Sequence, residues 1–273
     1  MTTPASECGH LASGLPYNRF GSGANDVVVF AGLGLENAPA TGMSASATIN
    51  PVKMLSDDHR LLIVNRRRGL PRGTTLSEMA EDYAAMIREE FAGPVDIIGM
   101  STGGSIALLF AIEHPELVRR LVVYSAAHRL DDPGKRFQRR LGELARARRW
   151  GTFASEGAAV LMLPRSGIKK LVTLPLRGVA WVFGTLAFRR IDPSDMVVTI
   201  DAEDAFDVRD RLGEVRAPTL VVGGGKDAGY STAIFRETAD GIPGAKLVVD
   251  PAGGHVPTSP MISRAIAEFL RPA

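Results

Sequence analysis

Residues 95–108, VDIIGMSTGGSIAL, place a serine on a crowded turn. Ser101 stands between Gly99 and Gly103, so the segment matches G-x-S-x-G where a run of apolar β-formers gives way to a helix-like run. Such a turn pushes the hydroxyl out of the fold and aligns it with a helix N-terminus, whose N–H groups stabilise negative charge. We therefore predict a nucleophilic serine; the alternative is a glycine-rich packing turn that holds a serine by chance.

A serine hydroxyl is a poor nucleophile near neutral pH until a base takes its proton. Of the five histidines, His255 lies in DPAGGHVPTSP, just past the last predicted strand, and so at the same edge of the sheet as Ser101. We predict that His255 is the base. His128 also follows a predicted strand and is the second candidate. Surface or helix-capping positions are expected for the remaining three, His10, His59 and His114.

The histidine in turn needs a carboxylate, which fixes its tautomer and stabilises its charged form. Asp227 lies three residues past a predicted strand and precedes His255 in the chain, so we predict that it is the acid. A turn-forming role is the alternative for this aspartate. Asp131 and Asp132, which follow another strand, are rival acids, whereas Asp250 lies too close to its own strand.

Short apolar runs alternate with helix-like runs, which is the pattern of βαβ units stacked into a mostly parallel sheet. The Val and Ile content of the apolar runs suits strands that are covered on both faces. The predicted strands are 26–30, 60–65, 95–100, 120–125, 219–224 and 245–250. Helices are predicted over 75–91, from Ser101 to His114, and near 257–270. The predicted fold class is α/β, with a mostly parallel central sheet flanked by helices.

Between residues 129 and 210 this rhythm stops, and an Arg-rich region followed by a Trp-, Phe- and Leu-rich region replaces it. We interpret 129–210 as an inserted helical cap, which divides the core into 1–128 and 211–273. Apolar and arginine side chains within 137–149 separate onto different helical faces. We expect this helix to dock by its apolar face with the arginines in solvent; contact with an anionic substrate or a membrane is the alternative.

The composition is that of an ordinary globular protein, with 273 residues, of which 45% are hydrophobic and 23% charged. The 32 basic and 30 acidic residues leave a net charge of +2, so no nucleic-acid partner is expected. A single cysteine, Cys8, can form neither an internal disulfide nor a cysteine-based zinc site, which suits a reducing compartment.

Two segments bear on location. The opening 14 residues lack the basic and apolar runs of a signal peptide, so we expect a cytoplasmic protein. Residues 171–188 are the most membrane-like, but Pro175, Arg177 and two glycines interrupt them. We expect a buried or lid helix there and no stable membrane insertion.

The chain order Ser101, Asp227, His255 on strand-end loops, with the G-x-S-x-G elbow and an insertion after the following strand, resembles the α/β-hydrolase fold family. The resemblance spans roughly residues 15 to 270. It implies an oxyanion hole formed by the backbone N–H groups of Thr102 and Leu33. Many members carry His-Gly before the second donor, whereas this chain has Ala31 and Gly32. Dehalogenases and epoxide hydrolases of this fold carry an aspartate at the elbow, so the serine argues against both.

The resemblance implies attack by the serine on a carbonyl, an acyl-enzyme, and its release by water, with no metal and no organic cofactor. Apolar cap residues indicate a small, largely apolar ester or lactone substrate; their alternative role is packing onto the core. These cap residues are Leu161, Met162, Leu163, Trp181, Phe183 and Phe188. The residues expected to bind substrate are Gly32, Met100, His128, Trp181 and Val256.

Two other functions stay open at this point. The same triad also serves cofactor-free perhydrolases, which are haloperoxidase-like, and carbon–carbon bond hydrolases in resembling families. A non-catalytic ligand-binding homologue is the third class, and it has no need of all three residues. The natural substrate, the position of the cap and formation of a homo-oligomer are not decided by the sequence.

Overall fold

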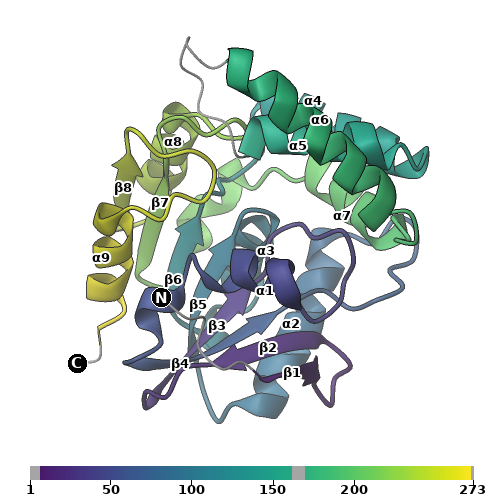
Figure 1. The fold of residues 1–273 in the computed structure, drawn as a ribbon. Helices are drawn as coiled ribbons and strands as arrows, with labels where there is room; N and C mark the ends of the chain where they lie inside the picture. Colours follow the sequence, from purple (N-terminus) through teal and green to yellow (C-terminus); the bar gives the residue numbers. More distant parts are fainter. Residues whose placement is uncertain (1–6, 162–169, 272–273) are drawn as a thin grey trace.

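The computed structural model of the chain describes residues 7–161 and 170–271. Its centre is one eight-stranded, mostly parallel sheet with helices on both faces, which confirms the predicted fold class (Figure 1). The strands are β1 (Glu7–His10), β2 (Pro16–Phe20), β3 (Asn25–Phe30), β4 (His59–Val64), β5 (Val95–Met100), β6 (Val118–Tyr124), β7 (Thr219–Gly224) and β8 (Lys246–Asp250).

The strand order across the sheet is β1-β2-β4-β3-β5-β6-β7-β8. The six strands from β3 to β8 are parallel, and each lies within two residues of a predicted strand. The prediction missed β1 and β2, which pair antiparallel with each other and with β4. Their sequences, ECGH and PYNRF, hold no run of apolar β-formers; β1 is an exposed edge strand, whereas β2 is largely buried between β1 and β4.

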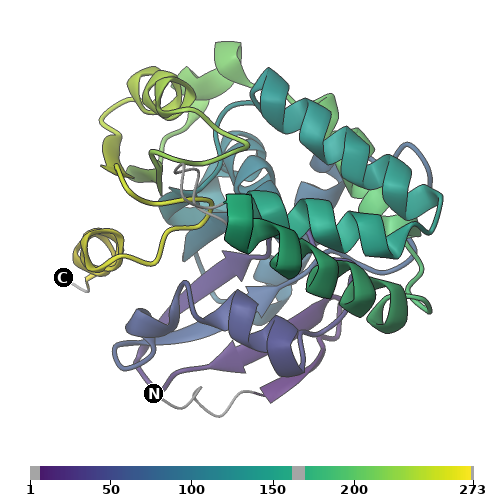
Figure 2. The same ribbon diagram turned by 45° about the horizontal axis from the view of Figure 1, so that its top comes forward.

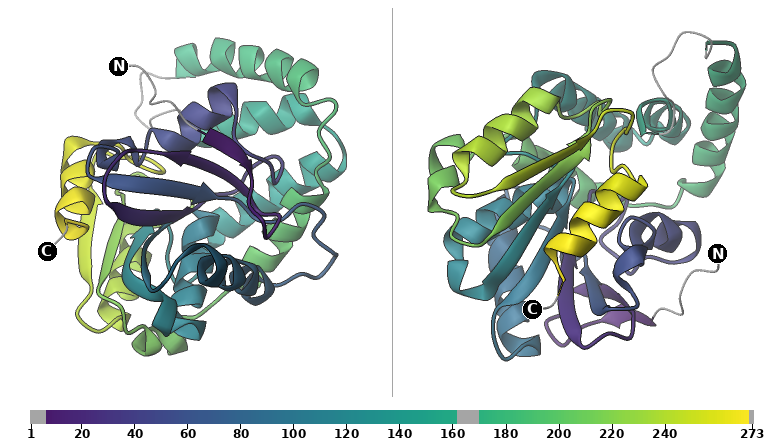
Figure 3. Two further views of the ribbon diagram at one scale, coloured as in Figure 1. Left: turned by 90° about the horizontal axis from the view of Figure 1, so that it is seen from below. Right: turned by 90° about the vertical axis from the view of Figure 1, so that its left-hand side faces the viewer.

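The helices are α1 (Gly42–Ile49), α2 (Leu76–Glu90), α3 (Thr102–Glu113), α4 (Asp132–Arg146), α5 (Trp150–Leu161), α6 (Lys170–Ala187), α7 (Ser194–Asp204), α8 (Thr232–Gly241) and α9 (Pro260–Phe269). Alternate residues of each central strand pack on opposite faces of the sheet. Side chains of α2, α3 and α8 cover one face, where Val28 and Phe30 point. Those of α1 and α9 cover the other, where Val27 and Val29 point. Figure 3 shows α8 and α9 on opposite faces of β7 and β8.

A buried carboxylate closes the amino end of β5. Asp96 is fully buried and accepts bidentate hydrogen bonds from Arg119 and from Arg120, at 2.6 to 2.9 Å. Burial alone would raise the pKa of Asp96, but the hydrogen bonds from the two guanidinium groups outweigh it and lower the pKa. Arg120 also donates to the carbonyls of Phe269 and Arg271, so it holds the end of α9 against the sheet.

Between β6 and β7 the chain forms the four helices α4 to α7, which lie together on one side of the sheet (Figure 2). We call these four helices the cap. They fall inside the range 129–210 that the sequence analysis assigns to an insertion, and the division of the chain into domains at these residues stays a prediction. Helices α5 and α6 pack closely against each other, and α4 packs on α5 and α7.

The arginines of α4 pair with acids of the cap itself. Arg139 lies 2.6 Å from Asp204, and Arg146 lies 2.6 Å from Asp201. The opposite face of α4 is buried, and its residues there are Gly134, Leu141, Gly142, Leu144 and Ala145. This arrangement is the expected docking by an apolar face, with the arginines occupied at the surface.

Helix α6, predicted as a buried or lid helix, is exposed on one side. The large apolar residues of 175–187 are 44 to 67% exposed, and they are Leu176, Val179, Trp181, Val182, Phe183 and Leu186. Its packed side includes Gly184, where an added Cβ would lie 2.5 Å from the Cβ of Ala154 on α5. None of the helices that the structure describes is long and apolar enough to span a membrane.

Two buried carboxylates on α7 attach the cap to the core. Asp195 accepts from the N–H groups of Gly69 and Leu70, at 3.0 and 2.7 Å. Glu203, 1% exposed, accepts from the hydroxyls of Thr102 (2.6 Å) and Ser105 (2.8 Å) in the first turn of α3. Hydrogen bonds accepted by charged groups are stronger than those between neutral groups. These bonds therefore fix α7 to the helix that begins after Ser101.

Gln138 of α4 and Tyr230 complete the surroundings of this carboxylate. The amide of Gln138 donates to Glu203 at 2.6 Å, and the hydroxyl of Tyr230 lies 3.5 Å from it. Four donors from three segments of the chain therefore converge on one buried acceptor. An amide in its place would present its own N–H₂ to groups that need an acceptor.

We expect Glu203→Gln to lower the free energy of unfolding by about 2 kcal/mol, because at least one buried hydroxyl loses its acceptor. For a chain of this size, that loss corresponds to a melting temperature lower by about 4 to 8 °C. Thermal unfolding followed by circular dichroism measures it. The matched control is Glu237→Gln, a half-exposed glutamate paired with Arg209, for which little change is expected. Equal melting temperatures for the two variants would contradict the role of Glu203.

Candidate active site

Ser101 occupies a strained turn between β5 and α3. Its backbone has φ of 51° and ψ of −124°, a conformation that residues other than glycine rarely adopt. The N–H of Ser101 donates to the carbonyl of Tyr124 on β6 at 2.8 Å. The turn therefore continues the sheet for one more hydrogen bond and then reverses directly into the helix.

The glycines around Ser101 are required by close packing. A Cβ added to Gly99 would lie 2.5 Å from the Cβ of Ala107, and one added to Gly104 would lie 2.4 Å from the Cβ of Ala126. At Gly103 it would meet the carbonyl of Phe30 on β3 at 2.1 Å. Helix α3 thus approaches β3, β5 and the end of β6 so closely that no larger residue fits at these three positions.

The structure brings the three predicted catalytic side chains into one hydrogen-bonded series. The Nε2 atom of His255 lies 2.9 Å from the Oγ of Ser101, and its Nδ1 lies 2.8 Å from the Oδ2 of Asp227. The Asp227 side chain is fully buried, and that of His255 is 16% exposed. This geometry lets Nε2 accept the serine proton while the carboxylate holds Nδ1–H. That these groups catalyse a reaction stays a prediction.

The loop that carries His255 is held by residues that the sequence analysis did not single out. Val256 has φ of 51°, and its N–H donates to the Oγ of Ser125 at 3.0 Å. The ring of Tyr230 stacks on the imidazole, with centroids 6.2 Å apart and planes at 8°. The hydroxyl of Tyr124 donates to the carbonyl of Pro257. These contacts join distant segments, so no local pattern in the sequence signals them.

The alternative acids lie elsewhere. Asp131 accepts from the N–H of Ser231 at 2.6 Å, and Asp132 is the first residue of α4. Asp250 accepts from the N–H of Ala252 in its own turn. Asp227 alone of these four aspartates contacts His255, and its other oxygen accepts from the N–H of Gly229 at 2.8 Å.

The two predicted oxyanion donors belong to the residue that follows the serine and to the loop that follows β3. Neither the N–H of Thr102 nor that of Leu33 donates to an acceptor within residues 7–161 and 170–271. Gly32 lies against the elbow, because a Cβ added to it would be 3.3 Å from the carbonyl of Met100 and 3.4 Å from the Cβ of Ser101. Two unpaired N–H groups next to the nucleophile suit the binding of a negatively charged oxygen.

The other predicted substrate-binding residues are placed differently. Met100 is buried at the end of β5, and Val256 follows His255 in the chain. Trp181 is half exposed on α6, next to Gly151 of α5. Leu33 packs with apolar cap residues, so this edge of the candidate site is apolar. Of the predicted apolar cap residues, Met162 and Leu163 lie outside the described residues.

His128 is not brought to the serine. Its ring is completely buried, and its Nδ1 lies 3.0 Å from the hydroxyl of Thr238 on α8. Burial lowers the pKa of His128, so the ring is neutral near pH 7. Its other nitrogen faces Arg209 at 3.4 Å. A ring enclosed in this way does not reach a substrate in this structure, so the expectation that His128 binds substrate finds no support.

The remaining histidines also lie away from the serine. His59 was expected at a surface or helix-capping position; it is 2% exposed, and its Nε2 lies 3.1 Å from the carbonyl of Leu270, the C-cap residue of α9. His114 ends α3 as expected but is also buried, 3.2 Å from Glu81. His10 is exposed on β1.

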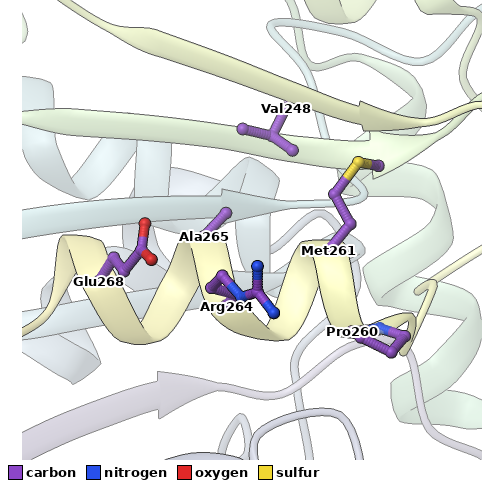
Figure 4. Close-up of a pocket in the computed structure, with 6 residues that line it drawn as sticks. All are labelled: Val248, Pro260, Met261, Arg264, Ala265 and Glu268. Carbon is purple, nitrogen blue, oxygen red and sulfur yellow. The ribbon is translucent and has the colours of Figure 1, made fainter.

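A surface hollow of about 420 Å³ lies between β8 and α9 (Figure 4). Its lining residues are Val248, Pro260, Met261, Arg264, Ala265 and Glu268. None of them is a predicted site residue, and none carries a nucleophile. The hydrogen-bonded series at Ser101, rather than this hollow, is therefore the candidate site.

Known proteins resemble this chain in sequence and in fold. RutD of Rhizobium rhizogenes, whose name assigns it provisionally to carbamate hydrolysis, is 27% identical over 226 residues, which cover 78% of this chain and 82% of RutD. A pimeloyl-[acyl-carrier protein] methyl ester esterase of Neisseria meningitidis is 28% identical over 183 residues, covering 65% of this chain and 68% of the esterase. The crystal structure of the enol-lactonase of Burkholderia xenovorans shares the fold, with a TM-score of 0.73 and 22% identity over 94% of this chain and 96% of that one.

A family model described as the Alpha/beta hydrolase family matches residues 27–271, almost the whole chain. The match includes every strand of the parallel part of the sheet except the first two residues of β3, together with the cap and the elbow. The relatives named above are an esterase and other hydrolases. The chain belongs to the alpha/beta hydrolase family.

Proposed function

We propose that the protein is a serine hydrolase that cleaves a carboxylic ester or lactone of a small, largely apolar substrate. The observation that carries the proposal is the series Ser101, His255 and Asp227, joined at 2.9 and 2.8 Å. A turn selected only for packing has no need of an imidazole at the serine oxygen or of a buried carboxylate behind it. The ester, lactone and carbamate substrates in the names of relatives are all attacked at a carbonyl carbon.

In the proposed acylation step, Nε2 of His255 takes the Ser101 proton while Oγ forms a bond to the carbonyl carbon. The carbonyl oxygen becomes an oxyanion, which the N–H groups of Thr102 and Leu33 stabilise. The intermediate then expels the alcohol oxygen, which takes the proton from the imidazolium. Water repeats the sequence on the acyl-enzyme and releases the carboxylic acid. Asp227 stays ionised throughout and stabilises the imidazolium.

The apolar nature of the substrate follows from the surroundings of one oxyanion donor. Leu33 packs against a cluster formed by the cap residues Trp150, Met196 and Ile200 and their apolar neighbours. A carbonyl bound at the N–H of Leu33 therefore carries its substituents toward an apolar wall, which favours hydrocarbon over charged groups.

The partner that we propose is this small molecule, with no nucleic acid and no stable membrane insertion. The single cysteine, Cys8, is an exposed free thiol, which suits the cytoplasmic location that we propose.

Replacing the nucleophile tests the proposal. We expect Ser101→Ala to lower kcat for a p-nitrophenyl ester by about 10⁵- to 10⁶-fold, as loss of such a nucleophile does elsewhere. A fluorophosphonate probe should label the parent protein on Ser101 and leave the variant unlabelled, as intact-mass spectrometry measures. A folded parent protein that neither takes the probe nor turns over esters, lactones or diketones would favour a ligand-binding homologue and contradict the proposal.

The acid is tested by a pair of matched variants. We expect Asp227→Asn to lower kcat by about 10⁴-fold, because the amide holds the imidazole in the wrong tautomer. The control is Asp131→Asn, an equally conservative change at a carboxylate that contacts Ser231 instead. Its kcat is expected to stay within about twofold of the parent, because surface substitutions away from a site have small effects. The reverse outcome, in which only Asp131→Asn loses activity, would reassign the acid.

A further inference from the structure

Arg66 is a buried cation beside the candidate site that the proposed mechanism does not use. It lies two residues past the end of β4 and is 2% exposed. Its Nη1 donates to the carbonyl of Ala31 and its Nη2 to the carbonyl of Gly32, both at 2.9 Å. The guanidinium therefore holds two successive carbonyls of the loop that follows β3.

The second of these carbonyls belongs to the peptide group that supplies an oxyanion donor. The C=O of Gly32 and the N–H of Leu33 are the two ends of one planar, trans peptide unit, so they point in opposite directions. When Arg66 fixes the carbonyl oxygen, it also fixes the direction of the N–H. Donation to the carbonyl further polarises the peptide and strengthens the hydrogen bond that its N–H can make.

Among the described residues, no close partner neutralises the charge of Arg66. Within residues 7–161 and 170–271 it forms no ion pair, and its Nε has no hydrogen-bond partner. Burial lowers the pKa of Arg66, and electrostatic interactions with Tyr83, Glu203 and Asp195 oppose that shift. A buried and unneutralised cation is costly for a fold, and among the described residues the guanidinium donates hydrogen bonds only to the two loop carbonyls.

Other side chains hold the rest of this loop. Asn18 pairs with the backbone of Ala40 through two hydrogen bonds of 2.8 Å, and Asn37 donates to the carbonyl of Arg67 at 2.9 Å. These contacts fix the far end of the loop, several residues past Leu33. The peptide of Leu33 itself is held by Arg66.

We propose that Arg66 is a positioning residue for the oxyanion hole, acting through the Gly32–Leu33 peptide to aim and strengthen the Leu33 N–H. This inference rests on the proposed function, because it presumes an oxyanion formed by attack of Ser101. Arg66 touches no reacting atom. Its effect is on the transition state, where the oxygen becomes charged, and not on binding of the neutral carbonyl.

The test compares two variants. Arg66→Met keeps most of the length of the side chain but removes its donors, whereas Arg66→Lys keeps the positive charge on one ammonium group in place of the planar guanidinium. For Arg66→Met we expect kcat on a p-nitrophenyl ester to fall about 10- to 100-fold, less than for complete loss of a donor, with KM within about threefold. Arg66→Lys is expected to fall between this variant and the parent.

A trifluoromethyl ketone supplies a readout that a purely structural role would not change. Ser101 Oγ adds to its carbonyl carbon, the proton passes to His255, and the resulting oxyanion occupies the same hole. We expect the inhibition constant to rise in Arg66→Met by about the same factor as kcat falls, because both report the charged oxygen.

Arg120→Met is the matched control. Arg120 also donates to two backbone carbonyls, but those of Phe269 and Arg271, at the opposite end of the sheet. We expect this variant to melt at a lower temperature, with kcat and the inhibition constant within about twofold of the parent. Parallel losses of kcat and ketone affinity in this control would reduce the role of Arg66 to general stability.

Two results would overturn the inference. One is a folded Arg66→Met with the kcat and inhibition constant of the parent; the other is a raised KM with unchanged kcat. Should Arg66→Met not fold, Arg66→Lys decides, and parental values in that variant count against the inference. A parent protein that neither cleaves esters nor binds the ketone would instead overturn the proposed function, and the inference with it.

Discussion

The packing of α3 against the sheet is the constraint on which the rest of the candidate site depends. The helix begins so close to β5 and β3 that Gly99, Gly103 and Gly104 have no room for a Cβ. In that space the chain can turn from strand to helix only at a residue with a positive φ. Ser101 is that residue, with a φ of 51°. The hydroxyl is therefore fixed before any partner arrives, and the unpaired N–H of Thr102 stands beside it as a consequence of the same helix start.

A strained turn persists only when its surroundings determine it, and here the surroundings are ionic as well as apolar. Glu203 holds the first turn of α3 from the cap side, and Arg66 holds the loop after β3 from the opposite side. Both side chains are almost completely buried, and they attract each other without forming an ion pair within the described ranges. Arg66 thus donates to backbone carbonyls of the loop after β3, and Glu203 accepts from hydroxyls of α3 as well as from Gln138 of α4. A lost partner at such positions leaves a buried charge, so these contacts restrict motion more than surface pairs do.

The sequence sufficed for those features that local pattern determines. The apolar runs predicted β3 to β8, and the spacing of Gly99, Ser101 and Gly103 predicted the turn, because strand burial and turn geometry act on neighbouring residues. The short polar strands β1 and β2 gave no such signal. Ser125, Arg66 and Glu203 were also missed, since each gains its meaning from a residue more than 30 positions away. Distant packing also explains why the prediction for His128 finds no support. Its position at the end of a strand predicted access to the site, but packing against α8 encloses the ring.

The proposed chemistry and the proposed substrate specificity belong to different parts of this chain. The proposed nucleophile, base and acid stand on loops of the parallel sheet, whose strands are buried on both faces and cannot shift singly without loss of packing. The apolar surface lies mainly in the cap, where α5 and α6 pack on each other and α6 leaves a row of large apolar side chains in solvent. Leu33 joins the two parts, because its N–H is a proposed oxyanion donor while its side chain packs with Trp150 and its neighbours. We therefore expect substitutions in the cap to act on the fit of the substrate, and the backbone of Leu33 to link that fit to the position of the charged oxygen.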